Sequence, residues 1–410
     1  FAVWKGTGGV ATGNFVYQFT AGKVGEHPHY MDRRRFLLGS AAAAQAALAQ
    51  SPPQEPVKPL PDSERVPTAI IGTGGRGSYL LRAALDQPNA KVAGLCDIKP
   101  DRLDRAATTA ARDNPSTTTD WHKIVERRDI DAVFIATPPH LHSEMAIAAL
   151  KAGKHVYCEK PIGVTARNVR DLVHAARASK KVFTAGQQLR SMRQFREAVD
   201  KIREGVLGDI LMVKAQRHAV ADLPHDGTSG DWYFDVNKSG GYLIEQSVHN
   251  LDLCNWVTGS RPARVVGFGG TSLYRNDPPG RSIFDHGSMT YEYANGVQMS
   301  FTQNVFHPRT MPAGSQYVYV YGSKGAVDLF APSNFYPRDP GAKAELFVTP
   351  GDRRENQHAH IARFYESIQK GTPSPADVVI GAEAAVTAIM GHEAMTRGKV
   401  ITWADMGVDL

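Results

Sequence analysis

Short apolar runs alternate with segments of helical period between residues 66 and 187. The runs have the length of buried strands, whereas the segments between them gather apolar residues on one helical face. The strand-like runs are at 66–71, 91–96, 131–137 and 154–158, and the helical segments at 78–85 and 143–150. Strands that alternate with helices favour an α/β fold with a doubly wound parallel sheet. We therefore predict one domain over 66–187.

The pattern changes after residue 187, where helical and strand-like stretches no longer alternate strictly. Helices are predicted over 193–204, from 240 through 252 and over 357–368, and strand-like segments run through 284–301 and 317–329. A chain of 410 residues is long enough for two domains plus appendages. Residues 188–410 are therefore predicted to form a second domain.

A cluster of basic and apolar residues at 31–49 follows neither pattern. Arg33 to Arg35 precede an apolar, alanine-rich stretch that ends in Ala47-Leu48-Ala49. This is the order of a secretory signal peptide with a small-x-small cleavage site. The stretch is shorter than the roughly 18 to 20 residues that span a bilayer, so we expect a removable signal and no stable membrane anchor. The arginines before Phe36 resemble a twin-arginine signal, which exports folded proteins; an ordinary signal for unfolded export is the alternative.

The segments that flank this signal carry no element of the fold. Residues 1–30 lack an initial Met and have no clear period, so we interpret them as a non-native upstream segment. Residues 50–65 are rich in proline and are predicted to be an extended linker. With the signal, this organisation predicts a periplasmic or otherwise extracytoplasmic protein.

Charge and cysteine content exclude several classes of function. The net charge of +6 falls to +3 once the first 49 residues, with five cations and two acids, are removed. Such a small and dispersed charge does not indicate a nucleic-acid surface. Cys96, Cys158 and Cys254 lie far apart in apolar stretches, without metal-ligand spacing. We expect buried thiols, no disulfide framework, no metal site and no nucleic-acid partner.

A glycine-rich loop connects the first predicted strand to the first predicted helix. It reads Gly72-Thr73-Gly74-Gly75-Arg76-Gly77. Gly72 permits a tight turn, Gly74 allows the backbone to approach a pyrophosphate, and Gly77 allows close packing of helix on strand. The loop predicts a dinucleotide site in a Rossmann domain.

An acidic residue at the end of the second strand supports the same prediction. Asp97 lies 20 residues after Gly77, where a carboxylate meets the adenosine ribose. A carboxylate there disfavours a 2′-phosphate, so NAD is predicted rather than NADP, although Arg76 and Arg102 leave NADP open. The alternative is that Asp97 is only a turn or helix-capping residue. Thr137, His142 and Lys160 follow later strands, at the edge of a parallel sheet where ligands bind.

Four motifs together resemble the Gfo/Idh/MocA oxidoreductases. They are the glycine loop, the Ala136-Thr137-Pro138 to His142 segment, Gly153-Lys154-His155-Val156 and Glu159-Lys160-Pro161, within a resemblance from about Val66 to Asp405. The resemblance implies a dinucleotide domain and a C-terminal α/β domain with a large open, mostly antiparallel sheet through which a homo-oligomer forms. It also implies that Lys160 acts at the substrate. The cofactor-binding residues are then Gly72, Gly74, Gly75, Arg76, Gly77, Asp97, Thr137, Pro138, His142, Glu159, Lys160 and Gln188.

The helix that opens at 240 carries the remaining candidate chemistry. Glu245, His249 and Asp252 recur at i, i+4 and i+7, beside an apolar stripe. Oxidation of a carbinol needs a base within reach of the hydroxyl, and Lys160 and His249 are the candidates. Glu245 could orient His249, yet it stands where dehydrogenases of the resembled family commonly have Asp, which leaves its reach open. A structural or helix-dipole role for Glu245 is the alternative.

Further residues are weaker candidates. Trp232 and Tyr233, with His218 and Asp231, lie in the predicted substrate loop. Arg190 matches a family position near the cofactor, and Asp285-His286 either contacts substrate or ends a strand. His358 and His360, at i and i+2, do not share a helical face and are not expected to bind a metal.

Three functions follow from these residues. The first is an NAD(P)-dependent oxidoreductase acting on a sugar, polyol or keto-sugar, with Lys160 and His249 handling the proton and Glu245 as a third catalytic residue. Free nicotinamide cofactor is scarce outside the cytoplasm, so we expect a tightly bound dinucleotide. The second is a glycoside-cleaving enzyme that oxidises its sugar transiently, and the third a non-catalytic sugar- or nucleotide-binding protein.

Overall fold

The computed structural model describes residues 57–219, 231–311, 314–330, 332–349 and 353–410. The predicted signal peptide over 31–49, the upstream segment and the linker up to residue 56 lie outside the described residues. The residues from Val57 onward form one compact unit that holds both sheets.

The first sheet is parallel and has the strand order β3-β2-β1-β4-β5-β6. Its strands are β1 (Val66–Ile71), β2 (Ala90–Cys96), β3 (Ser116–Thr118), β4 (Ala132–Ile135), β5 (His155–Cys158) and β6 (Phe183–Ala185). The connecting helices are α2 (Gly75–Leu85), α3 (Pro100–Thr109), α4 (His122–Val125), α5 (His142–Lys151) and α6 (Ala166–Ala178). The predicted doubly wound sheet is confirmed, because helices cover both faces and every strand except the edge strand β3 is largely buried.

In the part of the chain that the structure describes, the second sheet has nine strands in the order β14-β13-β12-β11-β7-β10-β9-β8-β15. They are β7 (Ile210–His218), β8 (Pro262–Gly270), β9 (His286–Tyr293), β10 (Gln298–Asn304), β11 (Gln316–Gly322), β12 (Gly325–Asp328), β13 (Ser333–Pro337), β14 (Glu345–Val348) and β15 (Ile401–Thr402). All neighbours are antiparallel except β7 and β10. The predicted large, mostly antiparallel sheet is confirmed, and the strand-like stretch at 284–301 is divided into β9 and β10.

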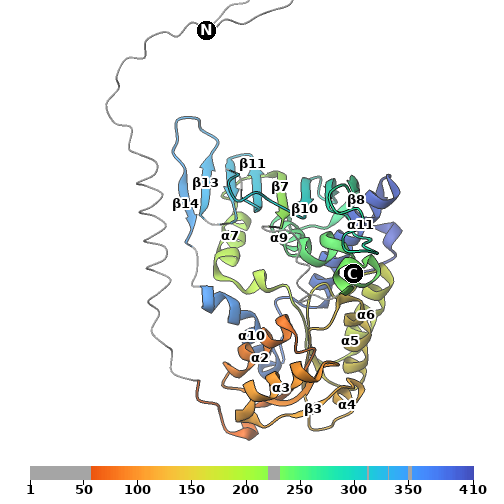
Figure 1. Ribbon diagram of the computed structural model, residues 1–410. Coiled ribbons are helices and arrows are strands. Elements are labelled where there is room, and N and C mark those ends of the chain that lie inside the picture. Colours follow the sequence, from red (N-terminus) through yellow and green to blue (C-terminus); the bar gives the residue numbers. More distant parts are fainter. Residues whose placement is uncertain (1–56, 220–230, 312–313, 331, 350–352) are drawn as a thin grey trace, which may run out of the picture. The chain divides into compact units, whose positions relative to one another are not determined.

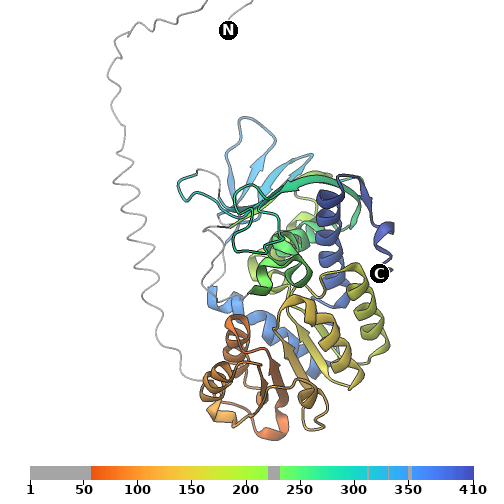
Figure 2. The ribbon, with the colours of Figure 1, turned by 45° about the vertical axis from the view of Figure 1, so that its right-hand side comes forward.

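Helices cover one face of the second sheet and join it to the first (Figures 1 and 2). They are α7 (Arg193–Arg203), α8 (Val236–Ser239), α9 (Val248–Thr258) and α11 (Val378–Arg397). Val213 and Ala215 of β7 and Val265 of β8 are buried in the core cluster that contains α7, α9 and α11, whereas Val236 of α8 packs against a smaller separate cluster. One core therefore extends from the first sheet into the second, and fixes the two domains around the site between them.

Helix α10 (Arg353–Lys370) comes from the second half of the sequence but packs on the first sheet. Ile361, Phe364 and Tyr365 are buried with Leu80 of α2, and the Tyr365 hydroxyl donates to Thr68 Oγ1 at 3.0 Å. Figure 1 shows α10 beside α2. The second half of the chain thus supplies a covering helix to the Rossmann domain.

Helix α11 is the most apolar element. Over an 18-residue window its mean hydropathy is 1.3, enough by composition to cross a membrane, but 72% of the window is buried inside the protein. Asp377 caps its start by accepting from the N–H of Ile380, and Gly398 ends it with a φ of +61°. Its apolar surface is therefore explained by the core, where it contacts α9 and β8.

Candidate active site

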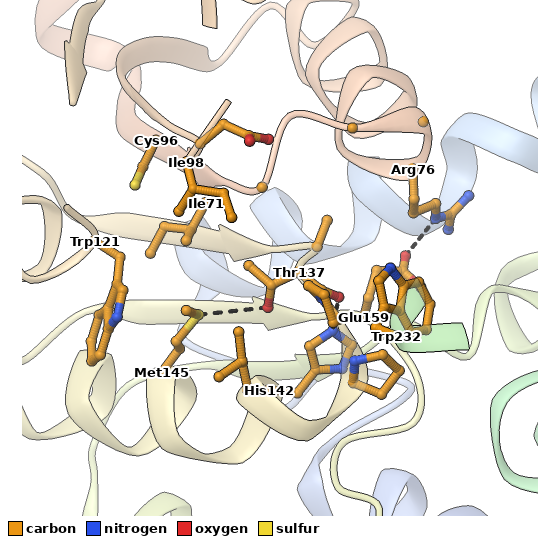
Figure 3. A pocket seen from close by; sticks show the side chains of 18 of the residues that line it. Ile71, Arg76, Cys96, Ile98, Trp121, Thr137, His142, Met145, Glu159 and Trp232 are labelled. Carbon is orange, nitrogen blue, oxygen red and sulfur yellow. Dashed lines mark hydrogen bonds and ion pairs between the residues drawn. The ribbon is translucent and has the colours of Figure 1, made fainter. Parts of the chain in front are cut away.

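A cavity of about 530 Å³ lies beyond the carboxyl ends of β1, β2, β4 and β5. Its walls are the glycine loop, the turns after the strands, the 3₁₀ turn η5 (Asp231–Phe234) and the π-helical turn η6 (Leu243–Ser247). Figure 3 shows Trp121 at one end and the ion pair of Arg76 with Glu159 at the other. Ligands of open α/β sheets bind at this edge. The cavity extends from the Rossmann domain to the second domain, as a site for two reactants requires.

The glycine loop leaves no room for side chains at two positions. Gly72 has a φ of +87°, and a Cβ there would lie 2.6 Å from the carbonyl oxygen of Ala136. A Cβ on Gly77 would lie 1.7 Å from the carbonyl oxygen of Gly72. Helix α2 begins at Gly75, after the N-cap Gly74, so its first N–H groups and positive dipole end face the cavity. The loop fits the pyrophosphate of a dinucleotide, with Gly74 and Gly75 lining the cavity and Gly77 packing behind them.

Asp97 lines the cavity and also holds the glycine loop. Its carboxylate accepts from the backbone N–H of Thr73 at 2.7 Å, from the Thr73 hydroxyl at 3.2 Å and from the backbone N–H of Lys99 at 2.9 Å. The side chain is 6% exposed. The turn role and the ribose role are therefore compatible, because Oδ1 accepts only one of these bonds and retains a lone pair for a ligand hydroxyl.

Arg102 and Arg76, the two cations that left NADP open, differ in their surroundings. Arg102 lines the cavity, and its Nη1 would lie 3.0 Å from a Cβ on Gly74, so its guanidinium stands next to the loop. Arg76 instead donates from Nε to Glu159 Oε1 at 2.7 Å and from Nη2 to Gln188 Oε1 at 3.4 Å. Gln188 is absent from the cavity wall and holds Arg76 from behind. Arg102 is thus the cation available to a phosphate.

The Arg76–Glu159 pair joins the glycine loop to the Glu-Lys-Pro segment. Glu159 is 3% exposed and also accepts from the Tyr157 hydroxyl at 3.2 Å and from the backbone N–H of Lys160 at 3.2 Å. Burial alone would raise the pKa of Glu159, but the charges of Arg76 and Lys160 hold it below its ordinary value. Glu159 is therefore an ionised anchor, and Lys160 follows it into the cavity.

The turns after β4 and β5 are tied together by His142. Its Nδ1 lies 2.7 Å from the carbonyl oxygen of Pro161, and its Nε2 lies 2.8 Å from that of Thr137. The side chain is 1% exposed. Thr137, Pro138 and His142 all line the cavity, so this connection holds the cavity wall beside Lys160.

Lys160 and Glu245 form an ion pair in the cavity wall. Lys160 Nζ donates to Glu245 Oε1 at 2.9 Å and to the Glu245 carbonyl oxygen at 2.5 Å, and the two side chains are 12% and 11% exposed. Glu245 lies in η6, whose wider π-helical turn replaces the regular helix that the sequence pattern predicts. Gln246 donates to Glu245 Oε2 at 2.5 Å. Glu245 thus orients Lys160, whereas the expectation that it orients His249 is wrong.

His249 lies behind this pair. It is not among the described residues that line the cavity, and its buried Nδ1 has no hydrogen-bond partner among them. Burial, and then the charges of Lys160 and Arg217, lower its pKa well below 6.5. His249 is therefore neutral at physiological pH, and Lys160 is the candidate base that directly faces the cavity.

Trp232 and Tyr233 form part of the cavity wall on the second domain, as the sequence predicts for substrate residues. Tyr233 is 6% exposed, and burial raises its pKa well above 10. Gln246 also lines the cavity, and Arg217 of β7 donates to Gln246 Oε1 at 3.3 Å. Sequence reasoning missed Arg217 and Gln246, since no motif marks a single residue in a strand or in a π-helical turn.

Arg190 and Asp252 do not line this cavity. Arg190 donates from Nε and Nη2 to Asp252 at 2.8 to 3.0 Å, and their side chains are 8% and 1% exposed. Arg190 lies at a separate cavity of about 460 Å³, beside the ring of Trp256. The placement of Arg190 near the cofactor is therefore wrong, and its role in the structure is a buried ion pair that joins η4 (Gln188–Ser191) to α9 within the second domain.

The other candidates also have structural contacts away from the cavity. Asp285 accepts from the backbone N–H groups of Ser272, Leu273 and Tyr274, and so holds the loop that follows β8. His218 contacts His307 and Thr302, and His360 contacts Ser191 and the carbonyl of Ala185. The three cysteines are buried and unpaired, as predicted. Among the described residues, no group of three His, Cys, Asp or Glu side chains could hold a metal ion.

Comparison with known proteins finds two family models that match successive parts of the chain. Residues 66–187 match the model of the oxidoreductase family with an NAD-binding Rossmann fold, and residues 195–328 match the Gfo/Idh/MocA C-terminal domain. An uncharacterized oxidoreductase of Streptococcus pneumoniae is 30% identical over 64% of this chain and 68% of its own length. The 2,7-anhydro-N-acetylneuraminate hydratase of Mediterraneibacter gnavus is 28% identical over 64% of this chain and 66% of its own.

A solved structure shows the same fold over most of the chain. Levoglucosan dehydrogenase, in complex with NADH and levoglucosan, has a TM-score of 0.72 at 20% identity and covers 82% of this chain and 99% of its own. With the family models and the relatives, the glycine loop, the Glu-Lys-Pro segment and the two sheets lead to one conclusion. The chain belongs to the Gfo/Idh/MocA family of oxidoreductases, and its first domain is an NAD-binding Rossmann domain.

Proposed function

We propose that this protein transfers a hydride between NAD and a carbinol or carbonyl carbon of a sugar, polyol or keto-sugar. The observation that carries the proposal is that Lys160 and the glycine loop face the same cavity. The loop can hold a dinucleotide, while Trp232, Tyr233 and Glu245 enclose the space next to Lys160. A cofactor and a small polar substrate can therefore meet beside a residue that handles protons.

The residues of the first domain fit NAD. Gly72 and Gly77 provide the close backbone approach, Asp97 has acceptor capacity for a ribose hydroxyl, and Arg102 can balance phosphate charge. When bound, the nicotinamide accepts or returns the hydride. Arg102 keeps NADP open as a second cofactor. None of these cofactor contacts involves Lys160, so its ammonium remains available to the substrate.

Lys160 is placed to move the proton. Its ammonium has three hydrogens, and two of them are directed to Glu245. The third is left for a substrate oxygen in the cavity. In oxidation the neutral amine takes the hydroxyl proton, and in reduction the ammonium returns it. Glu245 fixes the direction of Nζ, and neutral His249 lies behind it as a candidate relay.

A glycoside-cleaving or eliminating reaction is the second candidate. The relative from Mediterraneibacter gnavus is a hydratase of an anhydro sugar, so its name describes no net oxidation. Oxidising one carbon of a sugar acidifies the neighbouring C–H, which allows a C–O bond one carbon further on to break by elimination. Addition of water and return of the hydride then complete a redox-neutral cycle. The same cavity and the same base serve both reactions.

A substrate screen distinguishes these functions. The cofactor-loaded protein is incubated with hexoses, inositols, glycosides and anhydro sugars, and the products are identified by mass spectrometry together with NADH absorbance. Net NADH, or reduction of one sugar at the expense of another, supports the oxidoreductase. Cleavage without net NADH supports the second candidate. Binding without any product indicates the third possibility, a non-catalytic binding protein.

The export signal motivates a prediction about the cofactor. We propose that the chain is exported folded through the signal at 31–49 and retains NAD as a prosthetic group, because little free dinucleotide is available outside the cytoplasm. Protein isolated from the extracytoplasmic fraction is expected to release NAD in equal amount to the chain when denatured, measured by mass spectrometry. A lysine pair in place of Arg33 and Arg34 is expected to keep the protein in the cytoplasm. Exported protein without nucleotide contradicts the proposal.

The bare face of the second sheet motivates a prediction about assembly. Val266, Phe268, Tyr321 and Tyr336 share the face opposite the helices and are 38% to 74% exposed. We propose that two copies bury this face as a homo-oligomer. Light scattering is expected to show an oligomer that Phe268→Glu with Tyr321→Glu dissociates, while Ile98→Glu, at an exposed position on the first domain, does not. A monomeric wild-type protein contradicts this assembly.

A further inference from the structure

A polar chain runs from Lys160 across the cavity wall to β7. Lys160 Nζ contacts Glu245 Oε1, Gln246 Nε2 donates to Glu245 Oε2, and Arg217 Nη2 donates to Gln246 Oε1 at 3.3 Å. Gln246 and Glu245 both line the cavity. Arg217 therefore lies behind Gln246 at the substrate end of the cavity. Two side chains, those of Gln246 and Glu245, connect it to Lys160.

Arg217 differs from the other cations of this region because it has no carboxylate partner. Arg76 is paired with Glu159, and Lys160 with Glu245. Among the described residues no acid lies within ion-pair distance of Arg217, and its Nε is buried without a hydrogen-bond partner. Burying part of a guanidinium without a partner costs free energy. Such a cost is compensated when a ligand supplies the missing acceptor.

The neighbours of Arg217 provide no negative charge. Burial raises the pKa of Tyr242 to about 12 and that of Tyr233 well above 10, so both phenols are neutral. His249 is neutral as well. Glu245 is the nearby anion, and Lys160 already neutralises it. Arg217, behind Gln246 in the cavity wall, therefore carries a positive charge that has no counter-ion among the described residues.

We propose that the substrate is an acidic sugar whose carboxylate binds Arg217 while its reacting hydroxyl or carbonyl contacts Lys160. This rests on the proposed function, since it assumes that a sugar occupies this end of the cavity. The planar guanidinium can offer Nε with one Nη as a fork that matches a carboxylate, replacing the long contact to Gln246. One sugar ring is long enough for a reacting ring carbon to lie at Lys160 while a carboxylate on the opposite side of the ring lies at Arg217. Arg217 is thus a specificity-determining residue.

The test compares acids with neutral compounds of the same carbon skeleton. D-Glucuronate, D-galacturonate and D-gluconate are paired with D-glucose, D-galactose and D-glucitol, and the methyl ester of D-glucuronate serves as a neutral acid analogue. Dissociation constants are measured on NAD-loaded protein by tryptophan fluorescence, because Trp232 lines the cavity. At least one acid is expected to bind about tenfold or more tightly than its neutral partner and the ester.

Three variants assign this preference to Arg217. Arg217→Gln is expected to abolish it by weakening binding of the acid, and Arg217→Lys to retain part of it. Lys214→Gln is the matched control, since Lys214 is an exposed cation on the other face of the same strand. All variants are expected to bind NAD as the wild type does, which shows that they fold. A preference that persists in Arg217→Gln, or is absent from the wild type across the panel, overturns the proposal.

The binding measurements test the inference and the turnover measurements test the oxidoreductase proposal, so either hypothesis can fail without the other. If acids bind through Arg217 but no sugar exchanges hydride with NAD, the inference stands and the oxidoreductase proposal fails. If neutral sugars react as well as acids, the oxidoreductase proposal stands and the inference fails.

Discussion

Lys160→Met is expected to lower kcat by about 10²- to 10⁴-fold, with the affinity for NAD nearly unchanged. Methionine retains the length and apolar stem of lysine but carries no proton. Lys160 Nζ is the group in the cavity wall that is oriented by Glu245 and adjacent to the substrate space, so its loss removes the proton acceptor. Steady-state kinetics with the best substrate, and NAD titration by fluorescence, measure the two quantities. A variant that retains more than about a tenth of the wild-type kcat contradicts the assignment of Lys160 as base.

Two further variants separate chemistry from packing. Lys160→Met leaves the carboxylate of Glu245 almost buried without its cation, which also lowers stability. Lys160→Met with Glu245→Gln restores neutrality, so it is expected to regain stability without regaining kcat. Glu245→Gln alone keeps the acceptor oxygen for Nζ, and is expected to reduce kcat less than Lys160→Met does. His249→Asn is expected to have a smaller effect as well, because neutral His249 lies behind the wall.

Local determinants explain why the first domain could be predicted from the sequence. Each parallel strand is a short apolar run followed by a helix, and the glycines meet steric demands that arise within the loop itself, as between Gly77 and Gly72. The order of the second sheet could not be predicted in the same way. There β7 pairs with β10 and β11, which follow it by more than 80 residues, so the pairing depends on contacts that no local period reveals. The position of α10 on the first sheet is non-local for the same reason.

The residues of the candidate site also differ in whether local sequence or non-local contacts determine their position. Asp97 and Lys160 stand at fixed distances from short motifs, and the structure brings both to the cavity. The partner of Glu245 was predicted incorrectly because the spacing of Glu245 and His249 assumes a regular helix, whereas η6 is a π-helical turn. Arg217 carries no motif at all. Arg217 is notable because it has no carboxylate partner among its described neighbours, and those neighbours are known only from the folded structure.

Asp252→Ala is expected to destabilise the protein by about 3 to 5 kcal/mol, because it leaves Arg190 buried without its counter-ion. The carboxylate accepts three hydrogen bonds from the guanidinium, and both side chains are almost inaccessible to water. Neither residue lines the cavity that holds Lys160. The free energy of unfolding, from urea titration, is therefore expected to fall, while KM values of the folded fraction stay close to those of the wild type.

The exposed pair of Arg264 and Glu292 provides the matched control. Their N–O distance is also 2.8 Å, but their side chains are 58% and 42% exposed, so Glu292→Ala is expected to cost less than about 1 kcal/mol. Arg190→Met with Asp252→Leu removes both buried charges together, and is expected to recover much of the stability that Asp252→Ala loses. If Asp252→Ala and Glu292→Ala cost the same, burial does not determine the energy of the pair. If the double variant is no more stable than Asp252→Ala, the cost comes from lost packing rather than from an unpaired charge. Only the expected order of all three variants supports a stabilising buried ion pair between Arg190 and Asp252.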